Sequence, residues 1–206
     1  GGNCTTLADY RRRYAQYRMD PALQAAHAAS PWITTWDDHE VANDYSGIYS
    51  GRAEDPAAFL QRRTAAYQAY FENLPLPPSA LPVIGAVALY ASRRIGTLAE
   101  IFMLDQRQYR SAQACPLPGR AGGNRVGDEC AQLFDASRTM LGAEQEAWFD
   151  AALTRTRGRW NLLAQGTVFS HLDEQPGEGR RYTTDNWNGY FAARQRVLEA
   201  LQRHRV

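Results

Sequence analysis

Apolar residues recur at helical spacing near the start of the chain and predict a first helix there. Between residues 7 and 17 the apolar positions are spaced three or four apart, so that one face of the helix is apolar. These positions are Leu7, Tyr10, Tyr14 and Tyr17. Thr5 or Thr6 precedes the stripe as a candidate N-cap. We expect the stripe to pack in the core or against a neighbouring domain.

Two Asp-Pro pairs predict two further helices. Asp20-Pro21 and Asp55-Pro56 each combine an N-cap residue with a proline at the first helical position, which needs no N–H donor. The expected helices cover 22–29 and 57–73.

Short apolar segments bounded by polar or turn residues predict strands. They cover 32–34, 87–91, 98–104 and 160–164, and 167–170 is also strand-like. The turn at 93–96 joins two of these strands as a hairpin. The segment 98–104 is almost continuously apolar, so we expect it to be central and covered on both faces.

Two later helices complete the pattern. One opens at 141–145, and a last one runs from an Asp185 N-cap to Leu201, with Trp187 and Tyr190 as core aromatics. Strands that alternate with helices predict an α/β fold, a β-sheet core flanked by helices.

Length and charge restrict the class of protein. The 206 residues are enough for one domain with a core of its own. Lys and Arg number 23 and Asp and Glu number 22, a balance that argues against a nucleic-acid coat or a polybasic membrane binder. No apolar stretch approaches the ~20 residues that span a bilayer, so we expect no transmembrane segment in this chain.

Cys115 and Cys130 flank a loop rich in proline and glycine, and they are candidates for a disulfide. Closing a loop of this length stabilises the fold by ~3 kcal/mol in the chain-entropy model. Such a bond indicates an oxidising compartment. The alternative is two free thiols in a flexible loop. No CxxC spacing indicates zinc, and Cys4 has no assigned role.

The segment 35–44, TWDDHEVAND, holds the densest candidate chemistry in the chain. It contains four carboxylates, one imidazole and one carboxamide directly after a predicted strand. Oxygen and nitrogen donors at this density suit a hard or borderline metal ion and also general acid–base chemistry. The alternative is a helix cap or a solvated acidic loop, against which Trp36 suggests a partly walled site.

A second polar group, 105–110, follows the apolar strand 98–104, at the place where α/β proteins carry functional side chains. His171 follows the strand-like segment 167–170, and we expect a satisfied buried histidine there rather than a site residue. We expect His204 on the surface of the last helix.

Three blocks in order make the chain similar to a known family. They are TWDDHEVAND at 35–44, LDQRQYR at 104–110 and LGAEQEAWF at 141–149, framed by YRRRYAQYRMDPALQAAHAASPW at 10–32 and DNWNGY at 185–190. Together they resemble the PhoD-like phosphatases, secreted alkaline phosphatases and phosphodiesterases related to the metallophosphoesterases. The resemblance covers essentially the whole chain.

The resemblance implies a metallophosphoesterase-like layered sandwich, of which residues 1–206 are the central part of a single catalytic domain truncated at both ends. It also implies iron and calcium as cofactors. The intact protein is expected to hydrolyse small-molecule phosphate mono- and diesters outside the cytoplasm, and this piece alone to be inactive or nearly so.

The resemblance assigns roles to residues of the acidic run. Asp38 and Asn43, and also Asp37, are the candidate metal ligands. His39 is expected as a leaving-group acid or phosphate contact beside Asp38. Glu40 is expected behind the ligands or as a turn cap.

Arg107 is expected to hold a phosphate oxygen in a bidentate contact, and its alternative is a pair with Asp105. Two other functions stay open: a calcium- or carbohydrate-binding module whose acidic run holds a structural ion, and a catalytically dead homologue.

Overall fold

The described residues form five helices, three short 3-10 helices and two small sheets. The computed structural model describes residues 3–83 and 85–206. The helices are α1 (Leu7–Arg18), α2 (Pro21–Ala29), α3 (Pro56–Asn73), α4 (Ala143–Leu153) and α5 (Phe191–His204). The 3-10 helices are η1 (Pro78–Ala80), η2 (Ala131–Phe134) and η3 (Trp187–Gly189). The strands are β1 (Ala91–Ile95), β2 (Ala99–Met103), β3 (Arg125–Val126), β4 (Trp160–Ala164) and β5 (Tyr182–Thr183).

The larger sheet has the order β1-β2-β4, so β2 is central as predicted. β1 and β2 form an antiparallel hairpin, in which Ile95 pairs with Ala99 and Gly96 takes a positive φ of 53° at the turn. β2 and β4 are parallel, and the crossover between them carries α4. Phe102 of β2 is fully buried.

β1 lies four residues later in the chain than the segment 87–91 that we predicted. The backbone of Val87 is held by a side chain rather than by a strand. Its N–H donates to Gln108 Oε1 at 3.0 Å, and its carbonyl accepts from Gln108 Nε2 at 2.8 Å. The ladder starts only at Ala91, opposite Met103.

The segments 32–34 and 167–170 do not form strands, so that prediction was wrong. An apolar run becomes a strand only beside a partner backbone. Directly after the first segment, the Thr35 hydroxyl donates to the Leu104 carbonyl at 3.1 Å, which is a side-chain bond and not part of a ladder.

The N-caps of α1, α2 and α3 lie where the sequence placed them. Thr6 and Asp9 form a capping box on α1, and the carboxylates of Asp20 and Asp55 accept N–H bonds at the starts of α2 and α3. In the tyrosine stripe of α1, Tyr10 is buried but Tyr17 is 62% exposed, so the stripe is only partly core.

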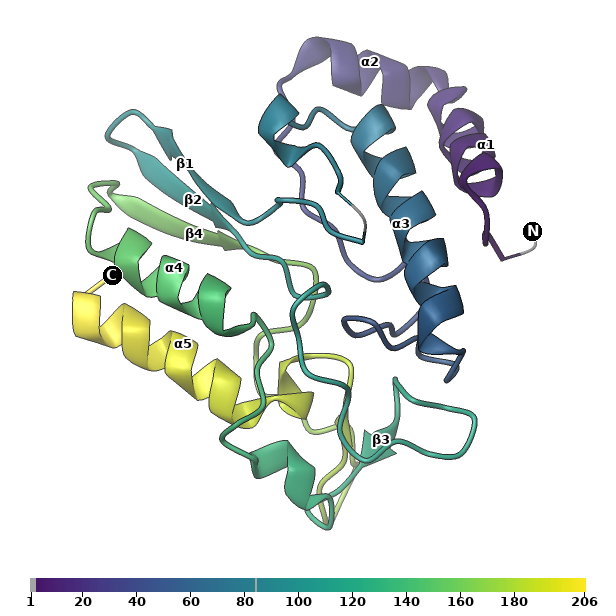
Figure 1. The fold of residues 1–206 in the computed structure, drawn as a ribbon. Coiled ribbons are helices and arrows are strands. Elements are labelled where there is room, and N and C mark those ends of the chain that lie inside the picture. Colours follow the sequence, from purple (N-terminus) through teal and green to yellow (C-terminus); the bar gives the residue numbers. More distant parts are fainter. Residues whose placement is uncertain (1–2, 84) are drawn as a thin grey trace.

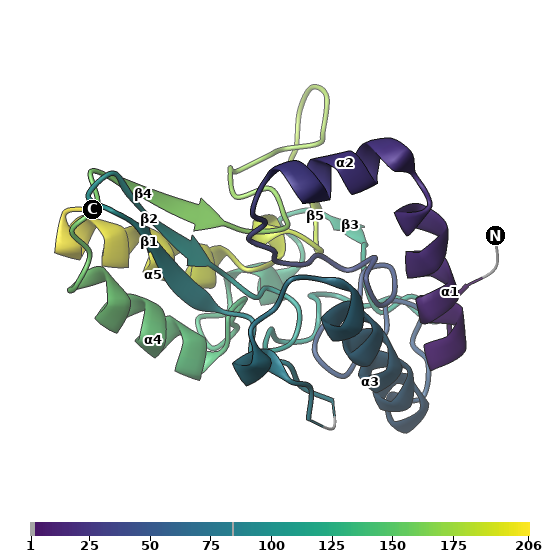
Figure 2. The same cartoon turned by 90° about the horizontal axis from the view of Figure 1, so that it is seen from above.

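The helices gather in two groups. α4 and α5 lie side by side against one face of the β1-β2-β4 sheet, and their buried residues form one core with Phe102 (Figure 1). α1, α2 and α3 lie on the other side of the molecule, where α3 packs with Trp36 in a second core (Figure 2). This arrangement confirms the α/β prediction of a sheet flanked by helices. No helix among the described residues combines the length and apolar character required to cross a bilayer.

Candidate metal centre

A buried carboxylate organises the loop that leaves β2. Asp105 is fully buried, and its Oδ1 accepts the indole N–H of Trp36 at 3.0 Å and the backbone N–H groups of Arg107 and Gln108 at 2.9 and 3.0 Å. Gln145 of α4 closes the other side, because its side chain accepts from Asp105 N at 2.8 Å and donates to Asp105 O at 2.7 Å. The loop therefore presents the Arg107 side chain in one fixed direction.

Arg107 points into a group of acids, and only 1% of its side chain is exposed. Its Nε and Nη2 donate to Asp37 Oδ1 at 2.9 and 2.5 Å. Its Nη1 and Nη2 donate to Asp185 Oδ1 and Oδ2 at 2.7 and 2.8 Å, and Nη1 also donates to the Tyr45 carbonyl at 3.3 Å. All five guanidinium N–H donors are thus used within the protein.

The guanidinium of Arg107 does not pair with Asp105, which was the alternative to a phosphate contact. Asp105 binds the backbone N–H of Arg107, whereas the guanidinium pairs with Asp37 and Asp185. Burial lowers the pKa of Arg107, but Asp185, Asp38 and Asp37 outweigh it and raise that pKa above its ordinary value. Contact with a phosphate oxygen stays a prediction.

Three carboxylates converge beside this guanidinium. Asp38, Asp44 and Asp185 each bring an oxygen to within 4.8 Å of the others. Asp38 is 7% exposed, and its Oδ2 accepts the backbone N–H of Asp44 at 2.7 Å. Asp44 has a positive φ of 59°, which turns the chain back towards Asp38.

The pKa values of Asp185 and Asp44 are shifted in opposite directions. Burial raises the pKa of Asp185, but Arg110 and Arg107 outweigh it and hold that pKa well below its usual range. Burial, Asp185 and Asp38 together raise the pKa of Asp44. The Asp44 carboxylate is the less compensated of the two, and it would gain most from a bound cation.

The three carboxylates also differ in how many hydrogen bonds their oxygens accept. Asp185 Oδ1 accepts from Arg107, Arg110 and Gln113, each at 2.7 Å, so its lone pairs are largely used. Asp38 Oδ1 has only longer contacts, at 4.0 Å to His39 Nε2 and 3.9 Å to Arg107 Nη2. Among the described residues, Asp38 Oδ1 and Asp44 Oδ1 accept no hydrogen bond and stay available as ligand atoms.

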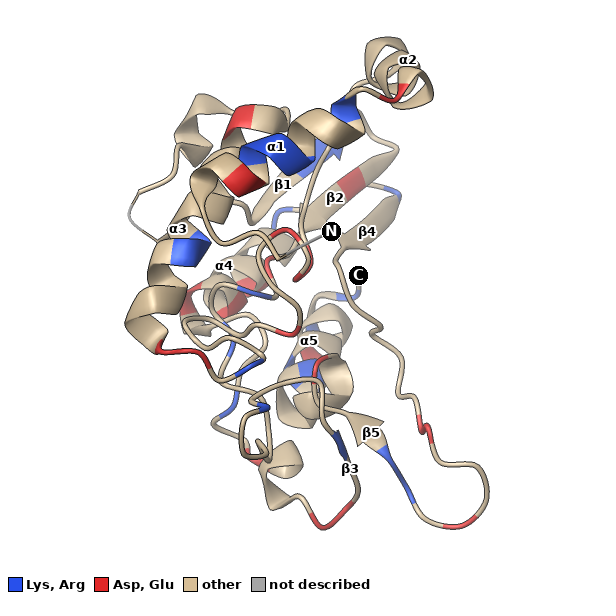
Figure 3. Ribbon diagram, turned by 90° about the vertical axis from the view of Figure 1, so that its right-hand side faces the viewer, with Lys and Arg blue, Asp and Glu red and all other residues tan. Residues whose placement is uncertain are grey.

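Charge also favours a cation at this place. The group contains four carboxylates, from Asp37, Asp38, Asp44 and Asp185, and two guanidinium groups, from Arg107 and Arg110. Four negative and two positive charges leave an excess of two negative charges, which a divalent ion would neutralise. Figure 3 shows that the loops at the centre of the molecule carry both acidic (red) and basic (blue) residues.

His39 and Asn43 lie at the rim of the group. Asn43 Nδ2 donates to Asp44 Oδ2 at 2.5 Å, which turns its Oδ1 towards His39 Nε2 at 2.8 Å. His39 Nε2 therefore carries a proton. The Asn43 hydrogen bond and the Asp38 charge raise the pKa of His39, whose side chain is 74% exposed. Glu40 accepts Asp37 N–H at 2.9 Å, as expected of a turn cap.

Gln113 ties the acids to the loop between the cysteines. Its Nε2 donates to the Asp44 carbonyl at 2.8 Å and to Asp185 Oδ1 at 2.7 Å. Its Oε1 accepts the Gly123 N–H at 2.7 Å and the Thr184 hydroxyl at 2.8 Å. Gln113 is 2% exposed and thus has all four of its hydrogen bonds inside the protein.

The predicted disulfide is present, because Cys115 and Cys130 are bonded with their Cα atoms 6.2 Å apart. The loop that it closes returns to the acids. Gly123 has a positive φ of 63°, and a Cβ there would lie 2.2 Å from Asp44 Oδ2. The proline- and glycine-rich loop is therefore a support of the site, and Cys4 is a free cysteine.

The sequence interpretation missed several residues of this site. Asp44 lies in the acidic run but was not predicted as a ligand. No sequence motif pointed to Gln113 as a site residue. Asp185 was predicted as the cap of the last helix, which was wrong: α5 starts at Phe191, and Asn186 caps η3 instead. The position of Asp185 in the DNWNGY block is the sequence feature that could have indicated its place in the site.

Two histidines lie apart from the site. His171 is exposed rather than buried, and its ring lies 5.1 Å from Tyr182 and 5.0 Å from Phe191, so the expectation of burial was wrong. His204 of α5 is only partly exposed, and its Nε2 lies 3.0 Å from Asp150 Oδ1.

Comparisons with known proteins identify the family of the chain. The family model of the PhoD-like phosphatases matches residues 2–206. Alkaline phosphatase D of Bacillus subtilis (strain 168) is 43% identical over 197 residues, which are 96% of this chain and 33% of that protein. A solved structure of PhoD matches with a TM-score of 0.92 and 39% identity, covering 100% of this chain and 38% of that one.

The chain therefore belongs to the PhoD-like phosphatase family, as its sequence motifs indicated. It spans about a third of the length of the relatives that it matches, 33% of one and 38% of the other.

Proposed function

We propose that this chain carries part of the catalytic site of a metal-dependent phosphoesterase that hydrolyses phosphate mono- or diesters. Family membership supports the reaction class. The observation that carries the proposal is the approach of Asp38, Asp44 and Asp185 to within 4.8 Å of one another. Acids at this distance repel one another unless cations balance them.

Asp38 and Asp44 are the ligands that we propose for a hard cation. Their free Oδ1 atoms form an oxygen-only donor pair, which fits Ca²⁺ better than a soft metal. Iron, the second metal that the resemblance implies, would need donors beyond these. Of the other predicted ligands, Asp37 is bound to Arg107, and Asn43 presents its carbonyl oxygen to His39. When bound, such ions polarise phosphoryl oxygens and activate water.

His39 is the proposed acid for the leaving group. It is exposed at the rim of the site, it carries a proton at Nε2, and the Asp38 charge favours its protonated form. Asn43 holds the ring in one orientation through the 2.8 Å bond. Because Nε2–H is donated to Asn43, the proton for a departing alkoxide would be the one that the protonated ring carries at Nδ1.

For Arg107 we propose a positioning role first and a phosphate contact second. A phosphate oxygen can reach its donors only if one carboxylate withdraws. Asp37, with 41% of its side chain exposed, is the freer of the two partners, whereas 17% of Asp185 is exposed. Arg107 therefore fixes the acids at rest, and it would exchange Asp37 for phosphate when an ester binds.

We also propose that the protein works outside the cytoplasm and that this chain alone has little activity. The Cys115–Cys130 disulfide supports an oxidising compartment. Two free carboxylate oxygens are too few to hold two metal ions. Measurable turnover by the isolated chain after loading with calcium and iron would contradict the second statement.

The decisive experiment is hydrolysis of chromogenic phosphate mono- and diesters by the full-length protein, with and without chelator, in wild type and Asp38→Ala. We expect chelator-sensitive turnover that falls at least about 100-fold in the variant, since a metal ligand is lost. Asp150→Asn, on the far surface of α4, is the matched control and should keep wild-type turnover.

The same experiment separates the two other functions. A structural calcium module would show no turnover, and Asp38→Ala would lower its melting temperature together with calcium binding. A catalytically dead homologue would bind metal in the wild type and turn over neither ester under any metal condition.

A further inference from the structure

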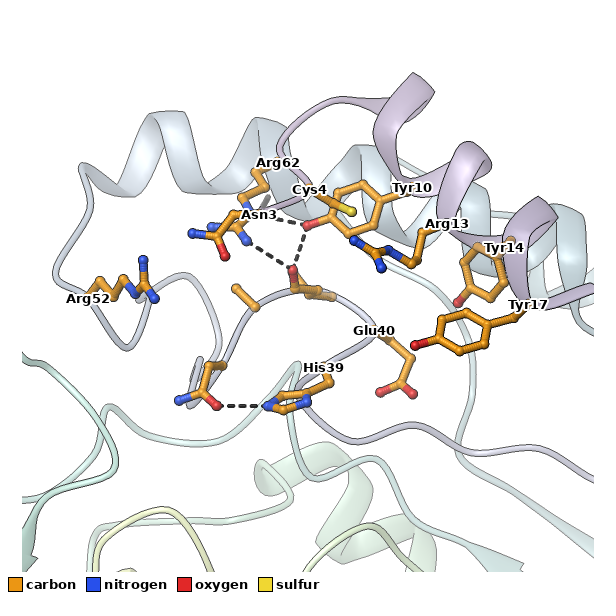
Figure 4. A pocket seen from close by; sticks show the side chains of 13 residues that line it. Asn3, Cys4, Tyr10, Arg13, Tyr14, Tyr17, His39, Glu40, Arg52 and Arg62 are labelled. Carbon is orange, nitrogen blue, oxygen red and sulfur yellow. Dashed lines mark hydrogen bonds between the residues drawn. The ribbon is translucent and has the colours of Figure 1, made fainter. Parts of the chain in front are cut away.

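A cavity of about 600 Å³ opens beside the acids, between α1 and the turn that carries His39 and Asn43 (Figure 4). One wall is the face of α1 that bears Tyr14 and Tyr17, and the floor is the turn 39–43. His39 and Asn43 belong both to this cavity and to the rim of the carboxylate group. The cavity therefore opens directly beside the carboxylate group.

Two arginines give the cavity a positive character. Arg13 reaches its centre from α1, and Arg52 stands at the end opposite Tyr17 (Figure 4). Among the described residues neither arginine forms an ion pair, and the nearest polar partner of Arg13 is Gln16 Oε1 at 3.5 Å.

Two further charged residues of the lining have partners of different kinds, a backbone N–H for Glu40 and a carboxylate for Arg62. Glu40 accepts Asp37 N–H, and Arg62 forms an ion pair with Glu54 at 3.0 Å. Within the part of the chain that the structure describes, two guanidinium groups without an ion-pair partner thus face a cavity next to a strongly acidic group. Guanidinium groups that face a cavity attract an anion to it.

The tyrosines supply the rest of the binding surface. Tyr17 is 62% exposed although it lies on an otherwise apolar stripe, and Tyr14 is half-buried beside it. Exposed aromatic rings next to arginine are suited to a ligand with a flat apolar part and an anionic end.

We propose that this cavity binds the alcohol part of the ester, and that Arg13 and Arg52 select esters whose alcohol part carries a negative charge of its own. The inference rests on the proposed function, because it places the phosphoryl group of the ester at the carboxylates beside the cavity. It adds a substrate class, phosphate esters of acidic alcohols, and names the residues that determine this specificity.

The test compares two matched substrates, 4-carboxyphenyl phosphate and the neutral 4-carbamoylphenyl phosphate, with the full-length protein. We expect wild type to favour the carboxylate in kcat/KM. In the Arg13→Gln/Arg52→Gln variant this preference should fall about fivefold or more, since charge-assisted hydrogen bonds are lost. Arg12→Gln is the matched control, because Arg12 pairs with Asp9, has 75% of its side chain exposed and lies outside the cavity. The proposal is overturned if wild type has no preference or if the double variant keeps it.

A binding measurement separates this inference from the proposed function. Calorimetry with 4-carboxybenzylphosphonate and its carbamoyl analogue needs no turnover. A protein that hydrolyses neither phosphate but still prefers the charged phosphonate, with the preference lost in the double variant, supports the cavity and contradicts the reaction. Equal or absent binding of both phosphonates contradicts the cavity.

Discussion

At the scale of single residues, the site depends on balance between buried charges. Asp185 is the common partner of Arg107 and Arg110, whose side chains are 1% and 0% exposed. Buried ion pairs add little net stability, but removal of one partner leaves an uncompensated charge. Asp185 is therefore a structural counter-charge, whereas Asp38 and Asp44 keep oxygens available.

We expect Asp185→Asn to lower the free energy of unfolding by about 3 kcal/mol or more, because two buried guanidinium groups lose their shared carboxylate. Asp150→Asn is the control, since Asp150 is 43% exposed where it pairs with Arg203. That change should cost less than ~1 kcal/mol. Urea unfolding of both variants measures the difference, and similar losses would contradict the role given to Asp185.

Two glycines of one loop offer a matched pair. Gly119 and Gly123 have similar positive φ values of 70° and 63°, but a Cβ at Gly119 meets nothing within 4 Å, whereas one at Gly123 meets Asp44. Gly119→Ala should lose only the ~1 kcal/mol of the left-handed conformation. Gly123→Ala should lose more, and in the full-length protein it should also weaken calcium binding, measured by calorimetry. Equal effects of the two changes would show that the loop does not support Asp44.

At the scale of elements, the disulfide-closed loop holds the acids from outside. Gly122 and Gly123 lie against Asp44, and Gln113, two residues before Cys115, bonds both Asp44 and Asp185. The Cys115–Cys130 bond restricts the conformations of the unfolded chain, and in the folded protein it holds the two ends of this loop together. Its loss should thus change both stability and the site.

We expect Cys115→Ser/Cys130→Ser to lower the free energy of unfolding by about 3 kcal/mol, the chain-entropy value for a loop of this length. Calcium affinity of the full-length protein should fall in parallel, because Asp44 loses its support. Cys4→Ser, which changes a free cysteine, is the control. A double variant that loses stability but keeps wild-type calcium affinity would separate the loop from the site.

Local chemistry explains which elements could be predicted from the sequence. An Asp before a Pro caps its helix through atoms two or three residues away, so α2 and α3 begin where the pattern placed them. Asp185 lies 78 residues from Arg107 in sequence, and no local pattern shows that bond. The segment 87–91 was misjudged for a similar reason, since the Gln108 side chain binds Val87.

The same contrast holds for the site. The acidic run identified Asp37, Asp38, His39 and Asn43 because these residues are adjacent in sequence. Gln113 and Asp185 reach the site only through the packing of distant loops. The family resemblance included Asp185 in the DNWNGY block, but it did not indicate that Asp185 pairs with Arg107.

At the scale of the whole molecule, the site joins the two groups of helices. The turn with Asp37, Asp38 and Asp44 follows α1 and α2 and packs with α3, whereas Arg107 leaves the sheet covered by α4 and α5. Trp36 makes the same connection, because its ring stacks on Tyr67 at 4.4 Å and its N–H reaches Asp105. A cation bound here would therefore stabilise the contact between both cores.

Removal of that cation should therefore destabilise the protein. With four carboxylates against two guanidinium groups, the full-length protein should unfold at a lower temperature after treatment with chelator. Calcium should restore stability by about 2.7 kcal/mol at 100 times its dissociation constant, as mass action requires for a ligand of the folded state. Asp44→Asn should abolish this gain, since it removes one proposed ligand and one of the two excess charges. If calcium stabilises Asp44→Asn as strongly as wild type, the ion binds elsewhere and the acids have another role.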